Sequence, residues 1–413
     1  MLALRSEVVG WLERRRGDVR FRRFGAHFDA LGTVLLRMLD RLNDELDDLP
    51  ADPGSCYERC RWLDGRLALV RALFDWYVTR YDQRLATSPH ADLLRAADEV
   101  ARGCWQEAFV AAGIAAPTGP LCYVEIGTDG HSLRRCPVPG DFRVPEDDPL
   151  AEFLRRLPAP LVALPEGAVR EPWWLVVVAH ETGHHVQHDL GLTEKTVRVV
   201  GSAVPADLKT EWETWSGELF ADVFSTLMVG EAAGWVVGEL QFGALDHLVR
   251  PTGPYPPPVV RTAVLDAVLR ELGADAKGED PLDWVPDRVA RHLKTVPAVV
   301  SAILGIAVTV KPLRSLADHD VLSTSGHVER WAAQLGRKSP VIAPLDTRTA
   351  PRLLLAAAVR RHRMYEDADP ALAYHNLVVA LGRSGAPGLL ASGTGREVGQ
   401  IADDLADLLL AED

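Results

Sequence analysis

Apolar residues recur at every third or fourth position through two long stretches near the start of the chain, a spacing typical of amphipathic helices. The two stretches are separated by residues 50–55, which contain two prolines and a glycine. Because such clusters end helices, we predict an antiparallel helical hairpin. Its apolar positions are Phe28, Leu31, Leu35, Met38, Leu42, Leu46, Leu49, Leu63, Leu67, Val70, Phe74, Tyr77, Tyr81 and Leu85. A third helix, over residues 92–112, is expected to pack on the hairpin.

The pattern changes after residues 117–120, which contain two prolines and a glycine. Two short extended segments, 121–126 and 160–165, are followed by predicted helices over 172–191 and 211–240. Further helices are predicted over 262–272, 285–310, 328–335, 350–365, 370–381 and 397–410. We therefore predict an α+β, predominantly helical fold in three parts. A helical region (1–116) and a second helical region (263–413) flank a core (117–262) with a small sheet.

One predicted helix carries the candidate chemistry. It begins at Pro172, suited to a first helical position, and Gly191 can end it in a left-handed conformation. It contains His180-Glu181-x-x-His184, in which the histidines are four residues apart and share one helix face. Glu181 is offset by about 100° and can reach water beside a bound ion. These residues follow an apolar run, so a metal would be a fitting partner for them in a buried helix.

Two imidazoles do not complete a catalytic zinc site, which usually takes three protein ligands and a water molecule. The best source of a third ligand is the segment 216–222, where Glu218 and Asp222 are four residues apart on a predicted helix. Their spacing allows both carboxylates to face the same side of that helix.

These two motifs together resemble the gluzincin branch of the zincin metallopeptidases, over roughly residues 120–262. The resemblance implies a zincin-like core with a small sheet and two active-site helices, with Zn²⁺ held by His180, His184 and Glu218. It also implies that Asp222 accepts the N–H of His180 and fixes its tautomer. Zincins place an edge strand along the cleft, and the segment 161–164 stands in that position.

The chain departs from this resemblance in two places. The gap between the two motifs, residues 185–217, is longer than in the thermolysin-like members, which leaves room at 192–210 for a short helix or lid. Several zincins also carry a His-Pro-Pro stretch and a later arginine, whereas here Tyr255 occupies the histidine's place. The segment 253–261 is therefore either a rigid linker or a wall of the active site. In the second case the Tyr255 hydroxyl would donate to the oxyanion, with His247 and Arg261 as further candidates.

Composition narrows the class of protein. The net charge of −13 and the pI near 5.5 argue against a nucleic-acid partner. The first residues lack the pattern of a signal peptide, and the longest apolar run, 296–310, is too short for a membrane span. The five cysteines do not form a disulfide framework. We expect a cytoplasmic protein with reduced thiols and no membrane partner, unlike the membrane-embedded prenyl-protein proteases of the same branch.

The sequence thus predicts a zinc-dependent metallopeptidase that cuts peptide or protein substrates, with metal-bound water activated by Glu181. One alternative is a non-catalytic zincin fold that binds a partner or a regulatory metal, although such a site needs no general base. The other is a helical scaffold that carries the motif by chance. The oligomeric state and the cleavage specificity are not set by the sequence.

Overall fold

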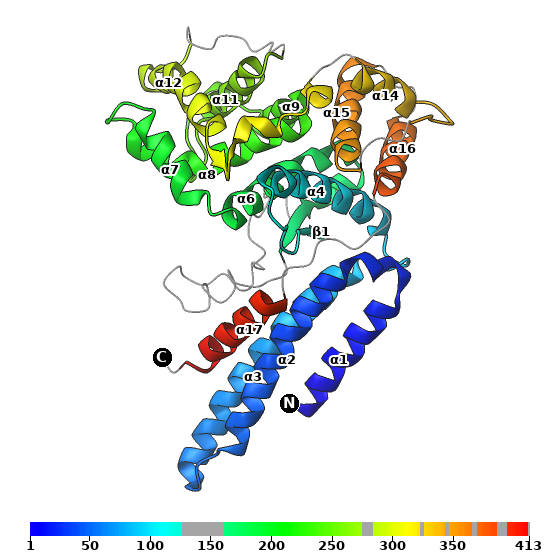
Figure 1. Cartoon of the computed structure of the whole chain (residues 1–413), viewed down its shortest axis with the longest axis vertical. Coiled ribbons are helices and arrows are strands. Elements are labelled where there is room, and N and C mark those ends of the chain that lie inside the picture. The colour runs from blue at the N-terminus through cyan, green and yellow to red at the C-terminus, as the bar shows by residue number, and fades with distance from the viewer. Residues whose placement is uncertain are drawn as a thin grey trace.

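The computed structural model describes residues 1–125, 160–274, 284–322, 326–342, 347–365, 370–385 and 395–411. Within these ranges the protein is predominantly helical, with two small two-stranded sheets, as the sequence predicts (Figure 1). Residues 127–159, between the two predicted extended segments, lie outside the described residues. No helix in the described part of the chain is long and apolar enough to cross a membrane.

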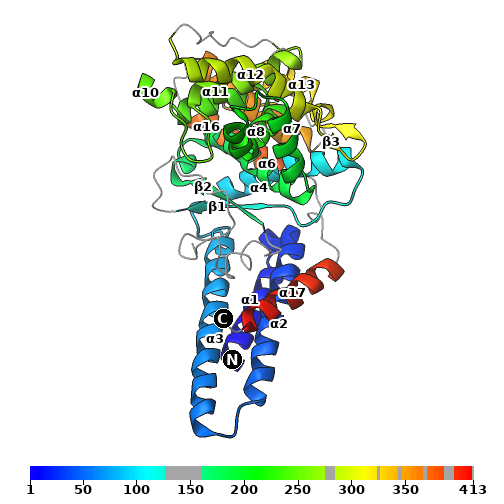
Figure 2. The same cartoon turned by 90° about the vertical axis from the view of Figure 1, so that its left-hand side faces the viewer.

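A long helical bundle forms one end of the molecule (Figures 1 and 2). It consists of α1 (Leu2–Gly17), α2 (Gly25–Asp47), α3 (Pro53–Asp82) and α17 (Gly395–Leu410), with a 3-10 turn at Val19–Phe24. The predicted hairpin is confirmed, because α2 and α3 pack together on either side of the break. The side chain of Asp52 accepts a hydrogen bond from the Ser55 N–H and so caps α3. The buried residues of this bundle form what we call the lower core.

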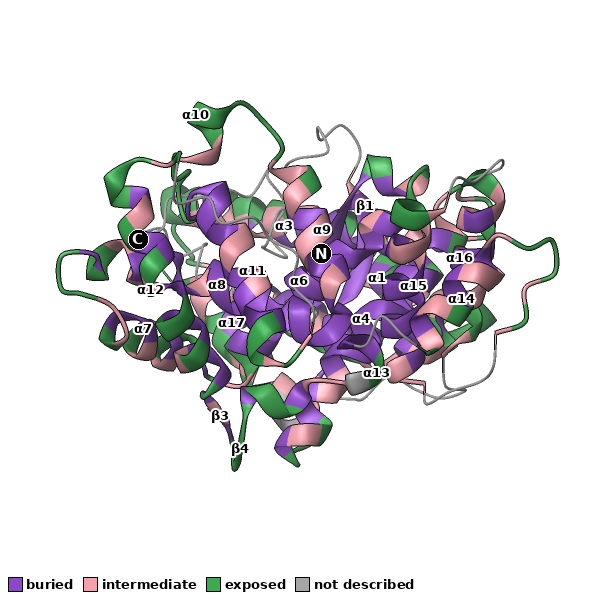
Figure 3. Ribbon diagram, turned by 90° about the horizontal axis from the view of Figure 1, so that it is seen from above, coloured by how far each residue is buried: buried purple, intermediate pink, exposed green. Residues whose placement is uncertain are grey.

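The remaining helices surround a second cluster of buried residues, the upper core. They are α4 (Ala91–Ala112), α6 (Val177–Asp189), α7 (Thr193–Ser202), α8 (Lys209–Val229), α9 (Glu231–Leu240), α10 (Leu245–Leu248), α11 (Pro258–Glu271), α12 (Asp287–Leu304), α13 (His319–Leu322), α14 (His327–Leu335), α15 (Thr349–Met364) and α16 (Pro370–Arg383). Figure 3 shows buried residues concentrated on α4, α6 and α8, with the exposed α10 at the margin.

A parallel sheet of β1 (Leu121–Glu125) and β2 (Leu161–Pro165) lies between the two cores (Figure 2). Side chains alternate across a strand, and here the alternation divides them between the cores. Leu121 and Tyr123 join the lower core, whereas Cys122 and Val124 join the upper core. Both faces of this sheet are therefore buried, which explains why the two strand segments carry almost uninterrupted apolar sequence.

Two helices belong to a different core from the one that their neighbours in the sequence suggest. α4 belongs to the upper core, so the prediction that it packs on the α2–α3 hairpin is wrong. α17 belongs to the lower core and lies along α2. The division into residues 1–116, 117–262 and 263–413 stays a prediction. Each of the two cores draws on residues from all three of these parts.

The helix predicted over 211–240 is two helices. Gly230 interrupts it with φ 61° and ψ −139°, a conformation that L-residues rarely adopt. A Cβ atom at this position would lie 2.8 Å from the carbonyl oxygen of Val321, so the close passage of this segment also requires glycine. α8 therefore ends at Val229, and α9 leaves in a new direction.

The helix predicted over 285–310 is also shorter than expected. α12 ends at Leu304, and the following residues form the antiparallel pair β3 (Ala307–Val308) and β4 (Lys311–Pro312). The predicted short helix or lid at 192–210 contains the helix α7, which packs against α8 and α12. The other helices predicted after residue 261 are present with shifts of a few residues at their ends.

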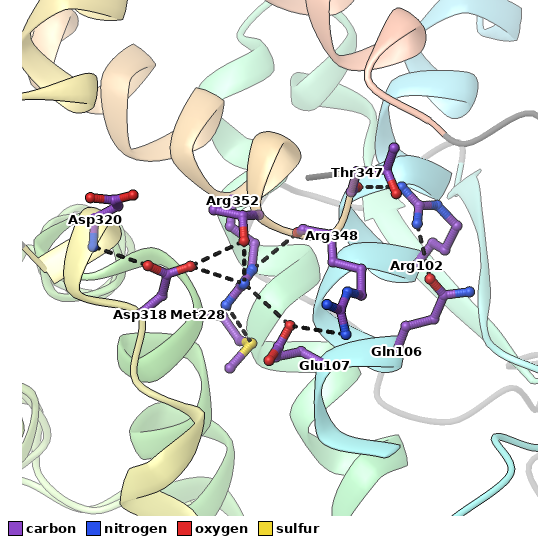
Figure 4. Close-up of polar contacts among 10 residues, drawn as sticks. Arg102, Gln106, Glu107, Met228, Asp318, Asp320, Thr347, Arg348 and Arg352 are labelled. Atoms are coloured by element: carbon purple, nitrogen blue, oxygen red, sulfur yellow. Dashed lines mark hydrogen bonds and ion pairs between the residues drawn. The ribbon is translucent and has the colours of Figure 1, made fainter. Parts of the chain in front are cut away.

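A buried arginine joins three parts of the upper core (Figure 4). Arg352 on α15 lies 3.4 Å from Glu107 on α4 and 3.3 Å from Asp318, which precedes α13. The same guanidinium lies 3.7 Å from the sulfur atom of Met228 on α8. Since its side chain is only 1% exposed, the two carboxylates supply the charge that a buried guanidinium needs.

Candidate metal centre and adjoining cavity

The local sequence accounts for the helix that carries the histidine motif. Residues Pro172–Val176 form a 3-10 turn that runs directly into α6, with the proline at its first position. Gly191, with φ 62°, follows the end of the helix and donates its N–H to the His188 carbonyl. The end predicted at Gly191 is therefore confirmed, and Pro172 begins the helical segment, but its first five residues form a 3-10 turn and the α-helix begins at Val177.

Three predicted ligands converge. Glu218 Oε2 lies 3.3 Å from His180 Nε2 and 3.7 Å from His184 Nε2. One donor atom from each of the three residues lies within 4.8 Å of the others. Donor atoms about 2.0–2.1 Å from a tetrahedral zinc ion are separated by about 3.3 Å. The spacing and the chemistry of this donor set are those of a group that could hold a metal ion, and the Glu218 side chain is fully buried.

This convergence depends on a close approach of α6 and α8. A Cβ atom added to Gly183, within the motif, would lie 3.0 Å from the Cα atom of Ala221 and 3.1 Å from the Phe224 ring. Such distances leave no room for a side chain between the two helices. Gly183 therefore allows α8 to pass near enough for Glu218 to reach both imidazoles.

Asp222 is placed where the sequence predicts it. Its Oδ1 lies 2.9 Å from His180 Nδ1, which leaves Nε2 of the imidazole facing His184 and Glu218. Arg261 on α11 donates two hydrogen bonds to the same carboxylate, of 2.6 and 2.8 Å. Burial raises the pKa of Asp222, but the charge and hydrogen bonds of Arg261 and the contact with His180 lower it more, so the net shift is downward. Asp222 is thus held ionised beside His180.

A cavity of about 480 Å³ adjoins these residues. His180 and Glu181 line it from α6. The further candidates also line it, His247 from α10, Tyr255 from the segment that leads into α11, and Arg261 from α11 itself. Five of the eight side chains that the sequence associates with chemistry therefore line one space. Glu181 lines this cavity although it is only 4% exposed to solvent.

The proline-rich segment forms part of the wall of this cavity. Thr252 and Tyr255 exchange two backbone hydrogen bonds, of 3.2 and 3.1 Å, which fold the segment into a tight turn. The guanidinium of Arg261 lies 5.3 Å from the centre of the Tyr255 ring, a cation–π contact. Of the two alternatives for this segment, the wall agrees with the structure.

One expectation, for the strand β2, is not met, and two further histidines of α6 lie outside the ligand group, as expected. The strand β2, expected to align the substrate, is buried along its length, and none of its residues lines the cavity. His185 lies 3.3 Å from the Leu161 carbonyl, and burial lowers its pKa. His188 is exposed beside Asp189. Neither histidine belongs to the ligand group.

Sequence reasoning missed the outer part of the cavity. Its rim includes Gln241 and Phe242, which follow α9, and its apolar wall includes Val236, Val237 and Leu240. The signal available in the sequence was the apolar run of α9, followed two residues later by Phe242. In the described part of the chain, one group of at least three potential ligands has donor atoms within 4.8 Å of one another. It consists of His180, His184 and Glu218.

Comparisons with known proteins do not assign the chain to a protein family. No protein-family model matches it, and neither a curated protein nor a solved structure is significantly similar to it.

Proposed function

We propose that this protein is a zinc-dependent metallopeptidase with a gluzincin-like core in residues 117–262. The observation that carries the proposal is the convergence of His180, His184 and Glu218 within 4.8 Å, beside a cavity lined by Glu181. α6 and α8 would be the two active-site helices. Two neutral imidazoles and a carboxylate are a donor set that zinc hydrolases use.

Bound Zn²⁺ would supply a Lewis acid that polarises a carbonyl group and lowers the pKa of water. Glu181 would accept a proton from the attacking water and return it to the leaving amine. The Tyr255 hydroxyl would donate a hydrogen bond to the developing oxyanion. Asp222, fixed by Arg261, would keep His180 in the tautomer that presents Nε2.

The test compares the wild-type protein with Glu181→Gln and with Glu194→Gln, a control on the exposed surface of α7. Zinc content is measured by elemental analysis, and hydrolysis is measured with a library of internally quenched peptides. We expect one zinc ion per chain in all three proteins, and hydrolysis that falls by at least about 100-fold only in Glu181→Gln.

Two outcomes would overturn the proposal. Absence of tightly bound metal would leave a helical scaffold in which the motif has no metal role. Stoichiometric zinc with equal rates for wild type and Glu181→Gln would favour the alternative of a zincin fold that binds a partner or a regulatory metal without catalysis.

A further inference from the structure

The cavity beside Glu181 has an inner and an outer wall of different character. The inner wall includes buried apolar residues of the 3-10 turn, α6 and α9, which are Val176, Val177, Ala233, Val236 and Val237. The outer wall includes Gln241, Phe242 and His247, which belong to residues 241–248, a segment that we call the flap. The structure describes every residue of the flap, and none of them is buried. A side chain bound in the cavity therefore meets apolar surface inside and a solvent-exposed segment outside.

The flap is attached at its two ends and by a contact of α10 with α11. In the described part of the chain its backbone hydrogen bonds are local, since Gln241 and Phe242 donate to α9 and the N–H groups of His247 and Leu248 donate to Ala244. Directly after the flap, Val249 is partly buried against the upper core. A segment without buried residues between two anchored ends is of the kind that opens and closes at low cost in free energy.

Two large apolar side chains of the flap stand in solvent. Phe242, which lines the cavity, is 88% exposed, and Leu245, three positions later on α10, is 66% exposed. Figure 3 shows α10 as an exposed helix at the margin of the molecule. Folding gains little from apolar side chains that remain in water, so their surface is available to a ligand. Exposed apolar residues beside an apolar cavity are typical of a binding surface.

The flap also carries a polar atom that a peptide can satisfy. The side-chain oxygen of Gln241 is buried and accepts no hydrogen bond from the part of the chain that the structure describes. A buried carbonyl oxygen without a donor costs free energy, and the backbone N–H groups of a peptide are suitable donors. Because Gln241 lines the cavity, this atom favours a polypeptide over a purely apolar ligand.

We propose that the flap closes over the cavity when a peptide binds, so that Phe242 packs on an apolar side chain of the substrate. The oxygen of Gln241 then accepts a hydrogen bond from the peptide backbone. This inference rests on the proposed function and names its substrate class, which is polypeptides with a large apolar residue beside the cleaved bond. Phe242 is a specificity-determining residue in this arrangement, and closure removes water from the space around Glu181.

The first experiment measures specificity. A peptide that the wild-type protein cuts is synthesised with either leucine or serine on each side of the cleaved bond. We expect wild type to cut the leucine peptide at least about tenfold more efficiently than the serine peptide. Phe242→Ala should lower kcat/KM for the leucine peptide by at least about tenfold and change that for the serine peptide by less than about threefold.

The control is Tyr57→Ala, which removes an aromatic side chain that is 67% exposed on α3 of the helical bundle. Its kcat/KM values should match those of wild type for both peptides. Lack of a preference for leucine in wild type, or equal effects of Phe242→Ala on the two peptides, would overturn the inference.

The second experiment measures closure. Amide hydrogen exchange of residues 241–248 is followed by mass spectrometry in zinc-treated Glu181→Gln, alone and with a blocked hexapeptide that has two central leucines. We expect the peptide to slow exchange of the flap by at least about tenfold and to leave exchange of α1 unchanged. Unchanged exchange in the flap, or failure of the peptide to bind in a calorimetric titration, would contradict closure. So would slow exchange that depends on protein concentration instead of peptide, since a second copy would then cover the flap.

Binding of the same hexapeptide separates this inference from the proposed function. If no peptide is hydrolysed, but the hexapeptide slows exchange of the flap and binds about tenfold more weakly after Phe242→Ala, the hydrolase proposal fails while the flap assignment stands. If hydrolysis depends on Glu181 but neither specificity nor binding depends on Phe242, the flap assignment fails alone.

Discussion

Arg261 and Asp222 are joined by two hydrogen bonds although they lie on different helices and are 39 positions apart. Sequence reasoning treats Arg261 as a candidate for the oxyanion, but its Nε and Nη2 atoms bind the carboxylate that contacts His180. Both side chains are buried, and the charge of Asp222 raises the pKa of Arg261 despite its burial. We conclude that Arg261 acts first through Asp222, and that it contributes to one wall of the cavity.

Replacing this arginine should weaken metal binding. In Arg261→Met, Asp222 loses its cationic partner and no longer holds His180 in one orientation. We expect zinc affinity, measured by competition with a chromophoric chelator, to fall by about 10–100-fold. Arg250→Met is the control, since the Arg250 side chain is 73% exposed and pairs with Asp246 at 3.6 Å. Equal zinc affinity in Arg261→Met and the control would contradict the role.

Glu218 should be essential for the metal, whereas another glutamate of the same helix should not. Glu218→Gln replaces a buried anionic ligand by a neutral amide, so we expect loss of stoichiometric zinc after dialysis against a weak chelator. Glu213→Gln is the control, because Glu213 is 32% exposed and pairs with Lys209 at 3.7 Å. Circular dichroism verifies that both variants are folded. Retention of zinc by folded Glu218→Gln would remove this residue from the ligand set.

The sequence identifies the centre because its signals are local. The spacing of His180 and His184 places both imidazoles on one helix face, and Glu218 and Asp222 repeat that spacing on a second helix. The outer part of the cavity could not be predicted from such local signals. The positions of Phe242 and α10 depend on how α9, α11 and α12 pack, and an amphipathic stripe does not name its partner. For the same reason the sequence did not assign α4 to the upper core. The break at Gly230 could not be predicted either, because it depends on the carbonyl group of Val321, far along the chain.

Arg352 should be a major contributor to stability. Arg352→Leu leaves the carboxylates of Glu107 and Asp318 without their buried cation, and each of these is 22% exposed. We expect the free energy of unfolding, from urea denaturation, to fall by about 3 kcal/mol. Arg348→Leu, one helical turn earlier and 30% exposed, should cost less than about 1 kcal/mol. Equal costs for the two variants would mean that the contacts of Figure 4 are energetically minor.

A buried histidine should make the junction of the two cores sensitive to acid. His27 lies 2.9 Å from the Tyr81 hydroxyl and 2.7 Å from the Gly119 carbonyl. Burial lowers its pKa from 6.5 to about 3, so the unfolded chain binds the proton more readily. The contribution of neutral His27 to stability is therefore complete above pH 6.5 and declines by about 1.4 kcal/mol per pH unit down to about 3.

This contribution is measured from urea unfolding at several pH values between neutral and mildly acidic. His27→Gln retains a donor and an acceptor but does not titrate, so its stability should decline less steeply with falling pH than that of the wild type. The exposed His375, replaced by glutamine, serves as the control. Parallel pH profiles for wild type and His27→Gln would show that His27 does not set the acid sensitivity.

The position of α17 on α2 has a consequence for synthesis on the ribosome. Arg41 and Asp407, which form an ion pair between these helices, are 366 positions apart. The α2–α3 hairpin emerges early, but the apolar surface that α17 covers stays open until nearly all of the upper core has been translated. During that interval the nascent chain presents an uncovered hydrophobic stripe, which makes the hairpin a natural binding site for a chaperone.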